Sequence, residues 1–203
     1  MTTAAGSHAV KTNTQKQSLA CLNIPAIIFK QLWDNFATGT PYTDKKTGKP
    51  PPGFENQCAI RMSVTLHGVG IDMKSFHSNA IFLNGKKTAI LAKDLAAWLD
   101  KKPFCGLPVK SENITGGNWE NHIKGKTGIV FFENYWRRAG ETNAHPTGSH
   151  IDLWNGSRLT ASGFVDGLAT FGRYVGIRTF LGGTEYGYSD LGGSTRILFW
   201  EIK

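Results

Sequence analysis

The sequence lacks the long apolar stretch that a membrane helix requires. None of its 203 residues belongs to a run approaching the roughly 18 apolar residues that span a bilayer. The first seventeen residues, MTTAAGSHAVKTNTQKQ, also lack the apolar core of a secretion signal. These absences predict a chain that is made in the cytoplasm, does not insert into membranes and does not use the general secretion pathway.

Cysteine is scarce, and its spacing excludes the common metal knuckles. The three cysteines, Cys21, Cys58 and Cys105, are too far apart to form a C-x-x-C motif. An odd count leaves at least one thiol free in any disulfide pattern within the chain. A bond between Cys21 and Cys105 would need an oxidising compartment, and the sequence leaves open whether it forms. No cofactor or metal motif is predicted.

Long basic runs are missing as well, although the chain is strongly positive. The formal net charge is +8 and the pI is about 9.5, so anionic partners are attracted. The lysines and arginines are spread in pairs, with no run of five. This scatter predicts no nucleic-acid arm and leaves an acidic wall polymer or acidic lipid as the partners that charge alone favours.

The composition is that of a globular protein of one domain. Apolar residues make up 40% and charged residues 19%, and the length suits a single core. Residues 1–20 are polar and poor in aromatics, which predicts a flexible leader. We therefore expect a single domain over residues 21–203.

Three segments have helical patterns, and the pattern in the later part of the chain predicts strands. Helices are predicted at 24–36 (inward stripe Ile28, Leu32 and Trp33), at 55–70 and at 88–102. Short strands separated by glycine-rich turns are predicted at 128–132, 149–154, 174–180 and 196–202. The order predicts an α+β fold in which N-terminal helices pack on a C-terminal antiparallel sheet. Residues 181–195 lack the lysine of a phosphate loop and are interpreted as a connection.

Cys58 lies where a reactive thiol is expected. It falls in the first turn of the predicted helix 55–70, where backbone N–H groups and the helix dipole stabilise a thiolate. The same N–H groups, with Asn56 or Gln57 nearby, could donate to an oxyanion. The alternative interpretation is that Cys58 is a small core residue without reactivity.

Of the six histidines, His150 is the best candidate for a general base. It opens the predicted strand 149–154 after a glycine-containing loop, so its imidazole can face a helix end. A third polar group would orient the ring, and Asp152, Asn155 and Asp166 are the candidates. Asp152 shares the strand face of His150, although residues two apart stand too far from each other for an assured contact. A zinc site at His145, His150 and Asp152 is the competing use, but its spacing matches no zinc motif.

Two motifs together resemble a known family. NQCAIRMS around Cys58, followed by GKTGIVFF and then GSHIDLWNGS, is similar to the type VI secretion amidase effectors of the fourth family. That resemblance implies a papain-like, NlpC-type fold and an amidase that cleaves the peptide stem of peptidoglycan, typically the γ-D-glutamyl to meso-diaminopimelate bond. Cys58 matches the nucleophile and His150 the general base. The third member is an acid beyond the WNG, where this chain departs from the pattern, since its nearest acid is Asp166.

The resemblance also implies partners and a site of action. Such effectors are exported by the type VI secretion apparatus, act in the periplasm of a target cell and are neutralised by a cognate immunity protein. Two alternatives remain. One is a cysteine peptidase or deamidase toxin acting on a protein, and the other is a non-catalytic basic binding module. Selective labelling of Cys58 at neutral pH would separate a nucleophile from a packing residue.

Overall fold

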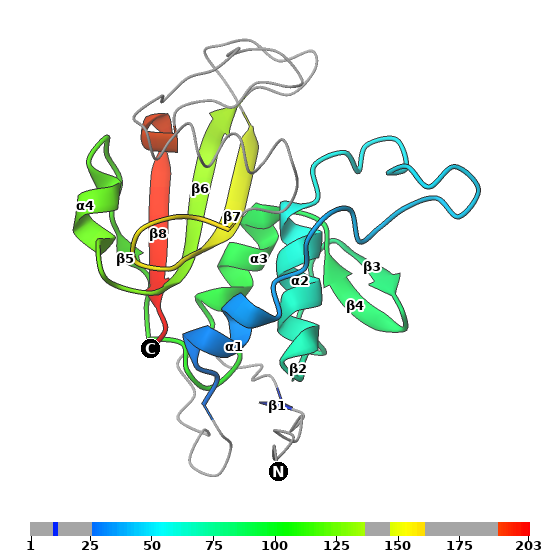
Figure 1. The fold of residues 1–203 in the computed structure, drawn as a ribbon, viewed down its shortest axis with the longest axis horizontal. Coiled ribbons are helices and arrows are strands. Elements are labelled where there is room, and N and C mark those ends of the chain that lie inside the picture. Colours follow the sequence, from blue (N-terminus) through cyan, green and yellow to red (C-terminus); the bar gives the residue numbers. More distant parts are fainter. Residues whose placement is uncertain (1–9, 12–25, 137–146, 161–190) are drawn as a thin grey trace.

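The computed structural model describes residues 10–11, 26–136, 147–160 and 191–203 and has the α+β class predicted from the sequence (Figure 1). Its helices are α1 (Phe29–Asp34), α2 (Cys58–Gly68), α3 (Ala92–Leu99) and α4 (Trp119–Ile123), with a 3-10 turn η1 (Leu191–Gly193). Its strands are β1 (Val10–Lys11), β2 (Ile71–Asp72), β3 (Ala80–Leu83), β4 (Lys86–Ala89), β5 (Glu112–Asn113), β6 (Gly128–Trp136), β7 (Gly148–Trp154) and β8 (Arg196–Glu201). In these residues no helix is long and apolar enough to cross a membrane.

A four-stranded antiparallel sheet forms the centre of the fold. Its strand order is β5-β8-β6-β7, so that β7 is an edge strand. The strands predicted at 128–132, 149–154 and 196–202 correspond to β6, β7 and β8, which confirms the antiparallel sheet in the C-terminal part. The strand predicted at 174–180 and the connection 181–195, up to residue 190, lie outside the described residues.

Both faces of this sheet are buried, and the alternation of side chains along the strands assigns each residue to one face. One face packs against α1, α2 and α3 in the larger core, to which β6 contributes Ile129 and Phe131. The other face packs against α4 in a smaller core that contains Val130, Phe132 and Trp119. Figure 1 shows α4 on the opposite side of the sheet from the other helices. On β7 the odd-numbered residues therefore face the larger core, and the even-numbered residues face the smaller one.

The first helix is shorter than predicted, and its inward stripe is shifted by one residue. Helix α1 begins at Phe29, because Ile28 is extended and Ile27 N–H donates to the carbonyl of Cys105 at 3.0 Å. Phe29 and Leu32 are buried, whereas Ile28 is 49% exposed, so the expectation that Ile28 faces inward was wrong. The residues before the helix are held by hydrogen bonds to distant chain segments, which periodicity does not reveal.

The helix predicted at 88–102 was placed too early. Residues 86–89 instead form β4, which pairs with β3 in an antiparallel hairpin, and the helix begins only at Ala92. The turn of this hairpin is Asn84-Gly85, and both residues have positive φ (51° and 74°). Asn-Gly between two short strands is the strongest local signal for a hairpin. The sequence therefore contained the signal that separates the strand from the helix.

Little of the expected leader is described, and the cysteines differ in state. Within residues 1–20 the structure describes only Val10–Lys11, which pair in parallel with β2 as a two-residue strand. Cys58 is free, whereas Cys105 is disulfide-bonded. Cys21, the remaining cysteine of the chain, lies outside the described residues.

Candidate active site

Cys58 is the first residue of α2, which begins three residues later than the predicted helix 55–70 and keeps Cys58 in the predicted first turn. The helix is anchored in the larger core by Ala59, Met62 and Leu66, which fixes the direction of its first turn. Its N-cap residue, Gln57, makes no side-chain capping hydrogen bond, so the N–H groups of the first turn are not closed by that side chain. The thiol thus sits beside a set of oriented donors at the positive end of the helix dipole.

The Gln57 side chain has a different role from the oxyanion donor considered above. Gln57 is fully buried, and its Nε2 donates to the carbonyls of Tyr42 (2.6 Å) and Phe54 (3.0 Å). Its Oε1 accepts from the N–H of Tyr42 at 2.9 Å. An amide has only two N–H bonds to donate, and both are used here. Gln57 therefore fastens the loop before α2 to the start of the helix and has no donor left for a substrate.

Cys58 lies against the edge of β7 that faces away from β6. Its Sγ is 3.9 Å from the carbonyl oxygen of Ser149, and it also interacts with the backbone N–H of Ile151. In a strand, the carbonyl of one residue and the N–H of the residue two positions later point to the same side. Both groups here point away from β6, so the start of α2 covers part of the sheet edge.

His150 projects from β7 between these two backbone groups. The side chain is partly exposed and lies on the face of the smaller core, where its ring stacks near Phe132 (centroids 6.4 Å apart) and meets the edge of Tyr135. A side-chain hydrogen bond joins His150 to Cys58. The structure therefore brings together the two residues that the sequence analysis selected as nucleophile and base.

Asp152 contacts the same imidazole, a contact that the two-residue spacing alone left open. His150 Nε2 is 3.3 Å from Asp152 Oδ2. The second carboxylate oxygen, Oδ1, accepts hydrogen bonds from the N–H of Leu153 (2.7 Å) and from the hydroxyl of Thr160. Asp152 is buried, and its two oxygens are thus divided between the ring and its own supports. Because Nε2 faces Asp152, Nδ1 is the nitrogen left for Cys58.

The proton balance of this group favours a thiolate and an imidazolium. Burial alone would raise the pKa of the Cys58 thiol, but the hydrogen bond and charge of His150, the Ile151 N–H and the charge of Arg61 together lower it. Burial likewise disfavours the charged form of His150, yet hydrogen bonds with Asp152 and Cys58 and their negative charges raise the pKa of His150 to about 9. The two opposite shifts both favour the state in which the ring holds the proton and the sulfur is a thiolate.

Thr160 was missed by the sequence analysis, and a turn brings it to the site. Gly156, with φ 95°, reverses the chain after β7, and Trp154 and Leu159 then form an antiparallel bridge. The Asn155 carboxamide oxygen accepts from the N–H groups of Ser157 (3.1 Å) and Arg158 (2.9 Å). Asn155 thus organises the turn, and in the described residues its side chain makes no hydrogen bond with His150. The Asn-Gly pair was the available signal that the chain folds back here.

The remaining candidates fall outside this group. Asp166 and His145 lie outside the described residues. Within the part of the chain that the structure describes, no group of three or more His, Cys, Asp or Glu side chains is arranged to hold a metal ion.

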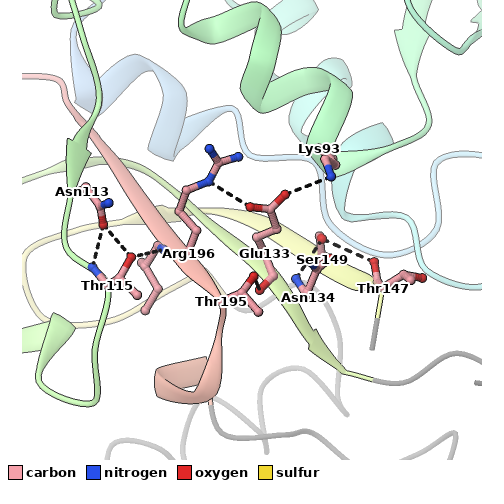
Figure 2. A network of polar contacts seen from close by, with 10 residues as sticks. Lys93, Asn113, Thr115, Glu133, Asn134, Thr147, Ser149, Thr195 and Arg196 are labelled. Atoms are coloured by element: carbon pink, nitrogen blue, oxygen red, sulfur yellow. Dashed lines mark hydrogen bonds and ion pairs between the residues drawn. The ribbon is translucent and has the colours of Figure 1, made fainter. Parts of the chain in front are cut away.

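A network of ion pairs around the buried Glu133 lies beside the site in the second half of β6. Glu133 is 8% exposed and accepts from Lys93 of α3 (3.2 Å) and Arg196 of β8 (2.9 Å), which approach its two oxygens from different elements (Figure 2). The next residue, Asn134, has φ 52° in a register shift of β6, and its N–H donates to Ser149 Oγ at 3.2 Å. The network thus ties α3, β6 and β8 together next to the backbone that contacts Cys58.

Comparison with known proteins identifies the family. A family model described as "Type VI secretion system (T6SS), amidase effector protein 4" matches residues 54–200, which is most of the chain and includes Cys58, His150 and Asp152. The chain belongs to this family. The match confirms the family resemblance predicted from the motifs around Cys58 and His150.

Solved structures of the family share the fold of this chain. The type VI effector Tae4 from Enterobacter cloacae is 22% identical with a TM-score of 0.50, over 88% of this chain and 97% of that one. The Tae4/Tai4 effector-immunity structure from Salmonella typhimurium (selenomethionine variant) gives 19% identity and a TM-score of 0.53, over 89% of this chain and all of the other. No curated protein matches the chain.

Proposed function

We propose that this member of the amidase effector family is a cysteine amidase that hydrolyses an amide bond in the peptide stem of peptidoglycan, the γ-D-glutamyl to meso-diaminopimelate bond. The observation that carries the proposal is the contact series from Cys58 through His150 to Asp152 at the start of α2. A nucleophile, a base and an orienting carboxylate in contact are the parts that acyl transfer requires. On this view the fold is a papain-like, NlpC-type one.

The first half of the reaction releases the amine. The Cys58 thiolate attacks the carbonyl carbon of the scissile amide, and a C–S bond forms as negative charge moves to the oxygen. N–H groups of the first turn of α2 stabilise that oxyanion. The Gln57 amide is already occupied, so Asn56 is the remaining side-chain candidate. The His150 imidazolium then donates its proton to the amide nitrogen as the C–N bond breaks. The products are a free amine and a thioester on Cys58.

The second half regenerates the enzyme. Neutral His150 takes a proton from a water molecule, whose oxygen attacks the thioester carbonyl. The C–S bond breaks, the carboxylic acid product leaves, and the thiolate and imidazolium pair forms again. Asp152 keeps Nε2 of the ring engaged throughout, so that Nδ1 stays directed at the sulfur.

The place of action and the partners follow from the family. Delivery by the type VI secretion apparatus would bring the chain to the periplasm of a target cell, where its substrate lies. Effector-immunity structures from Enterobacter cloacae and Salmonella typhimurium pair Tae4 with the immunity protein Tai4, so a cognate immunity protein is the expected partner here. The positive charge of the chain suits an anionic wall, and neither nucleic-acid binding nor membrane insertion is part of the proposal.

The test is mass spectrometry of diaminopimelate-type peptidoglycan fragments after incubation with the purified protein. We expect a new diaminopimelate amino terminus with the wild type and none with Cys58→Ala or His150→Ala. His122→Ala is the matched control, because His122 is exposed on α4 and should leave cleavage unchanged.

Circular dichroism must show that each variant is folded. A Cys58→Ala protein that cleaves at the wild-type rate would refute the mechanism. A folded wild-type protein that cleaves no wall fragment would refute the substrate and favour a protein-directed cysteine enzyme or a binding module.

A further inference from the structure

A basic loop projects beside the start of α2. Residues 37–54, which we call the basic loop, connect α1 to α2 and extend away from the helices (Figure 1). The turn at its far end carries exposed Lys45, Lys46 and Lys49 and one carboxylate, Asp44, which gives three positive charges less one negative charge, a net +2. Within the described part of the chain, none of the three lysines forms an ion pair with an acidic side chain.

The single carboxylate of the loop is used to shape its turn. Asp44 Oδ1 accepts from the N–H groups of Lys46 and Thr47, both at 2.9 Å. Backbone hydrogen bonds of 2.8 Å from Asp44 to Lys49 and from Gly48 to Asp44 close the same turn. These bonds gather the three lysine backbones in one tight turn, and among the described residues no acidic side chain pairs with their ammonium groups.

The base of the loop is fixed next to the thiol. The buried Gln57 amide binds Tyr42 and Phe54, which lie before and after the lysine turn in the sequence. The rings of Tyr42 and Phe54 also meet edge to face, with centroids 5.0 Å apart. Because Gln57 immediately precedes Cys58, the loop is held in a defined position relative to the start of the candidate active site. Pre-ordering of this kind lowers the entropy lost on binding.

We propose that the basic loop is a docking surface for the carboxylate groups of the wall polymer. This inference rests on the proposed function and adds the contact that retains the polymer. Peptide stems linked through the γ-carboxyl of glutamate keep a free α-carboxylate, and the wall repeats such groups many times. Each exposed ammonium group contributes little alone. Three ammonium groups that face a polymer with many carboxylates raise the local concentration of that polymer and the probability that it rebinds after dissociation.

The experiment compares two triple variants in the full chain with Cys58→Ala, so that bound wall is not cleaved. The loop variant replaces all three lysines of the turn with glutamine. The control variant removes the same charge from exposed lysines elsewhere that have no ion-pair partner in the described residues: Lys101→Gln, Lys110→Gln and Lys124→Gln. Binding is measured by pelleting with insoluble diaminopimelate-type sacculi at low and high salt.

We expect the loop variant to bind sacculi about 10-fold more weakly at low salt and the control variant to bind nearly as the parent does. The difference should shrink at high salt, because ions screen exposed charges. The parent protein should bind sacculi whose carboxylates are converted to amides weakly. Its affinity for them should match the affinity of the loop variant for untreated sacculi. Equal binding by the loop variant and the parent, or full binding of amidated sacculi, would overturn the inference.

Cleavage of small soluble wall fragments, measured with Cys58 intact, separates this inference from the proposed function. The loop variant should cleave them at the wild-type rate, since a small fragment does not need the polymer contact. A matching loss of fragment cleavage would place the loop in the chemistry and would also overturn the docking role. If the wild type cleaves nothing, the proposed function fails, while the binding comparison still decides whether the loop recognises wall carboxylates.

Discussion

His150 and Asp152 lie two residues apart on β7, and 3.3 Å separates Nε2 of the ring from Oδ2 of the carboxylate. Both side chains project from the same face of one strand, so this half of the site is assembled as soon as β7 takes its place in the sheet. Cys58 comes from α2 and reaches the ring over the strand edge. The precision of the site therefore depends on how α2 packs against β7.

Selective alkylation should detect the thiolate of Cys58. Burial raises the pKa of this thiol, but His150 more than offsets that effect and the pKa is lowered. Iodoacetamide should therefore react with Cys58 at a lower pH than with an ordinary thiol, whose pKa is about 8.5. His150→Ala should move the pH profile of labelling upward, because the hydrogen bond and the positive charge are lost. The modified residue is identified by peptide mass spectrometry, and a profile that His150→Ala leaves unchanged would contradict the pairing.

The pH dependence of wall-fragment cleavage should report on His150. The reaction needs the protonated ring, whose pKa is raised to about 9, so kcat/KM should fall as pH rises through about 9. Asp152→Asn removes a group that raises this pKa, and the alkaline limb should move to lower pH. We also expect kcat to fall roughly 10²-fold to 10⁴-fold, since the ring loses its orienting partner. An unchanged alkaline limb in a folded Asp152→Asn protein would exclude Asp152 from this role.

Thr160 should act through Asp152. Its hydroxyl donates to Oδ1 of Asp152, so Thr160→Val removes the donor while keeping the shape of the side chain. We expect kcat to fall about 10-fold with little change in KM, which corresponds to the loss of one hydrogen bond to a charged group. Thr160→Ser should restore kcat and the alkaline limb. If serine and valine behave alike, the effect is one of packing.

The local parts of the site were predictable from the sequence, and the contacts between segments were not. The position of Cys58 in a first turn follows from the pattern of apolar residues in α2. Strand β6 follows from a short apolar run and β7 from apolar-polar alternation. The contact between the Asp152 carboxylate and His150 depends on the orientation of both side chains, which the sequence does not give. Thr160 reaches Asp152 through a turn, and Gln57 binds the loop before α2. Both contacts join separate segments of the chain, and hydrophobic periodicity does not predict such contacts.

His67 should make stability depend on pH. It is 9% exposed at the end of α2, and burial, then the nearby charge of Lys86, lowers its pKa, with the Lys87 backbone and Asp72 opposing this. The unfolded chain therefore binds this proton more tightly than the folded chain. Its contribution to stability is fully present above the ordinary pKa of about 6.5 and is lost as pH falls below it.

Thermal unfolding between pH 8 and pH 5 measures this effect. We expect Tm to decline toward pH 5 in the wild type and to decline less in His67→Gln. His122→Gln, at an exposed position, should keep the wild-type slope. Parallel slopes for wild type and His67→Gln would show that His67 does not carry the dependence.

The full occupation of the Gln57 amide has a consequence for how this chain can be inactivated. With that side chain engaged by Tyr42 and Phe54, the proposed mechanism relies on main-chain N–H groups at the start of α2. Every residue except proline supplies such a group, so few single substitutions can delete one without disturbing the helix. Under the proposed mechanism, the backbone therefore stabilises the oxyanion, and most side-chain substitutions at the start of α2 leave that stabilisation intact. Mutations that abolish activity should occur mainly at Cys58, at His150 and at the residues that hold them in place.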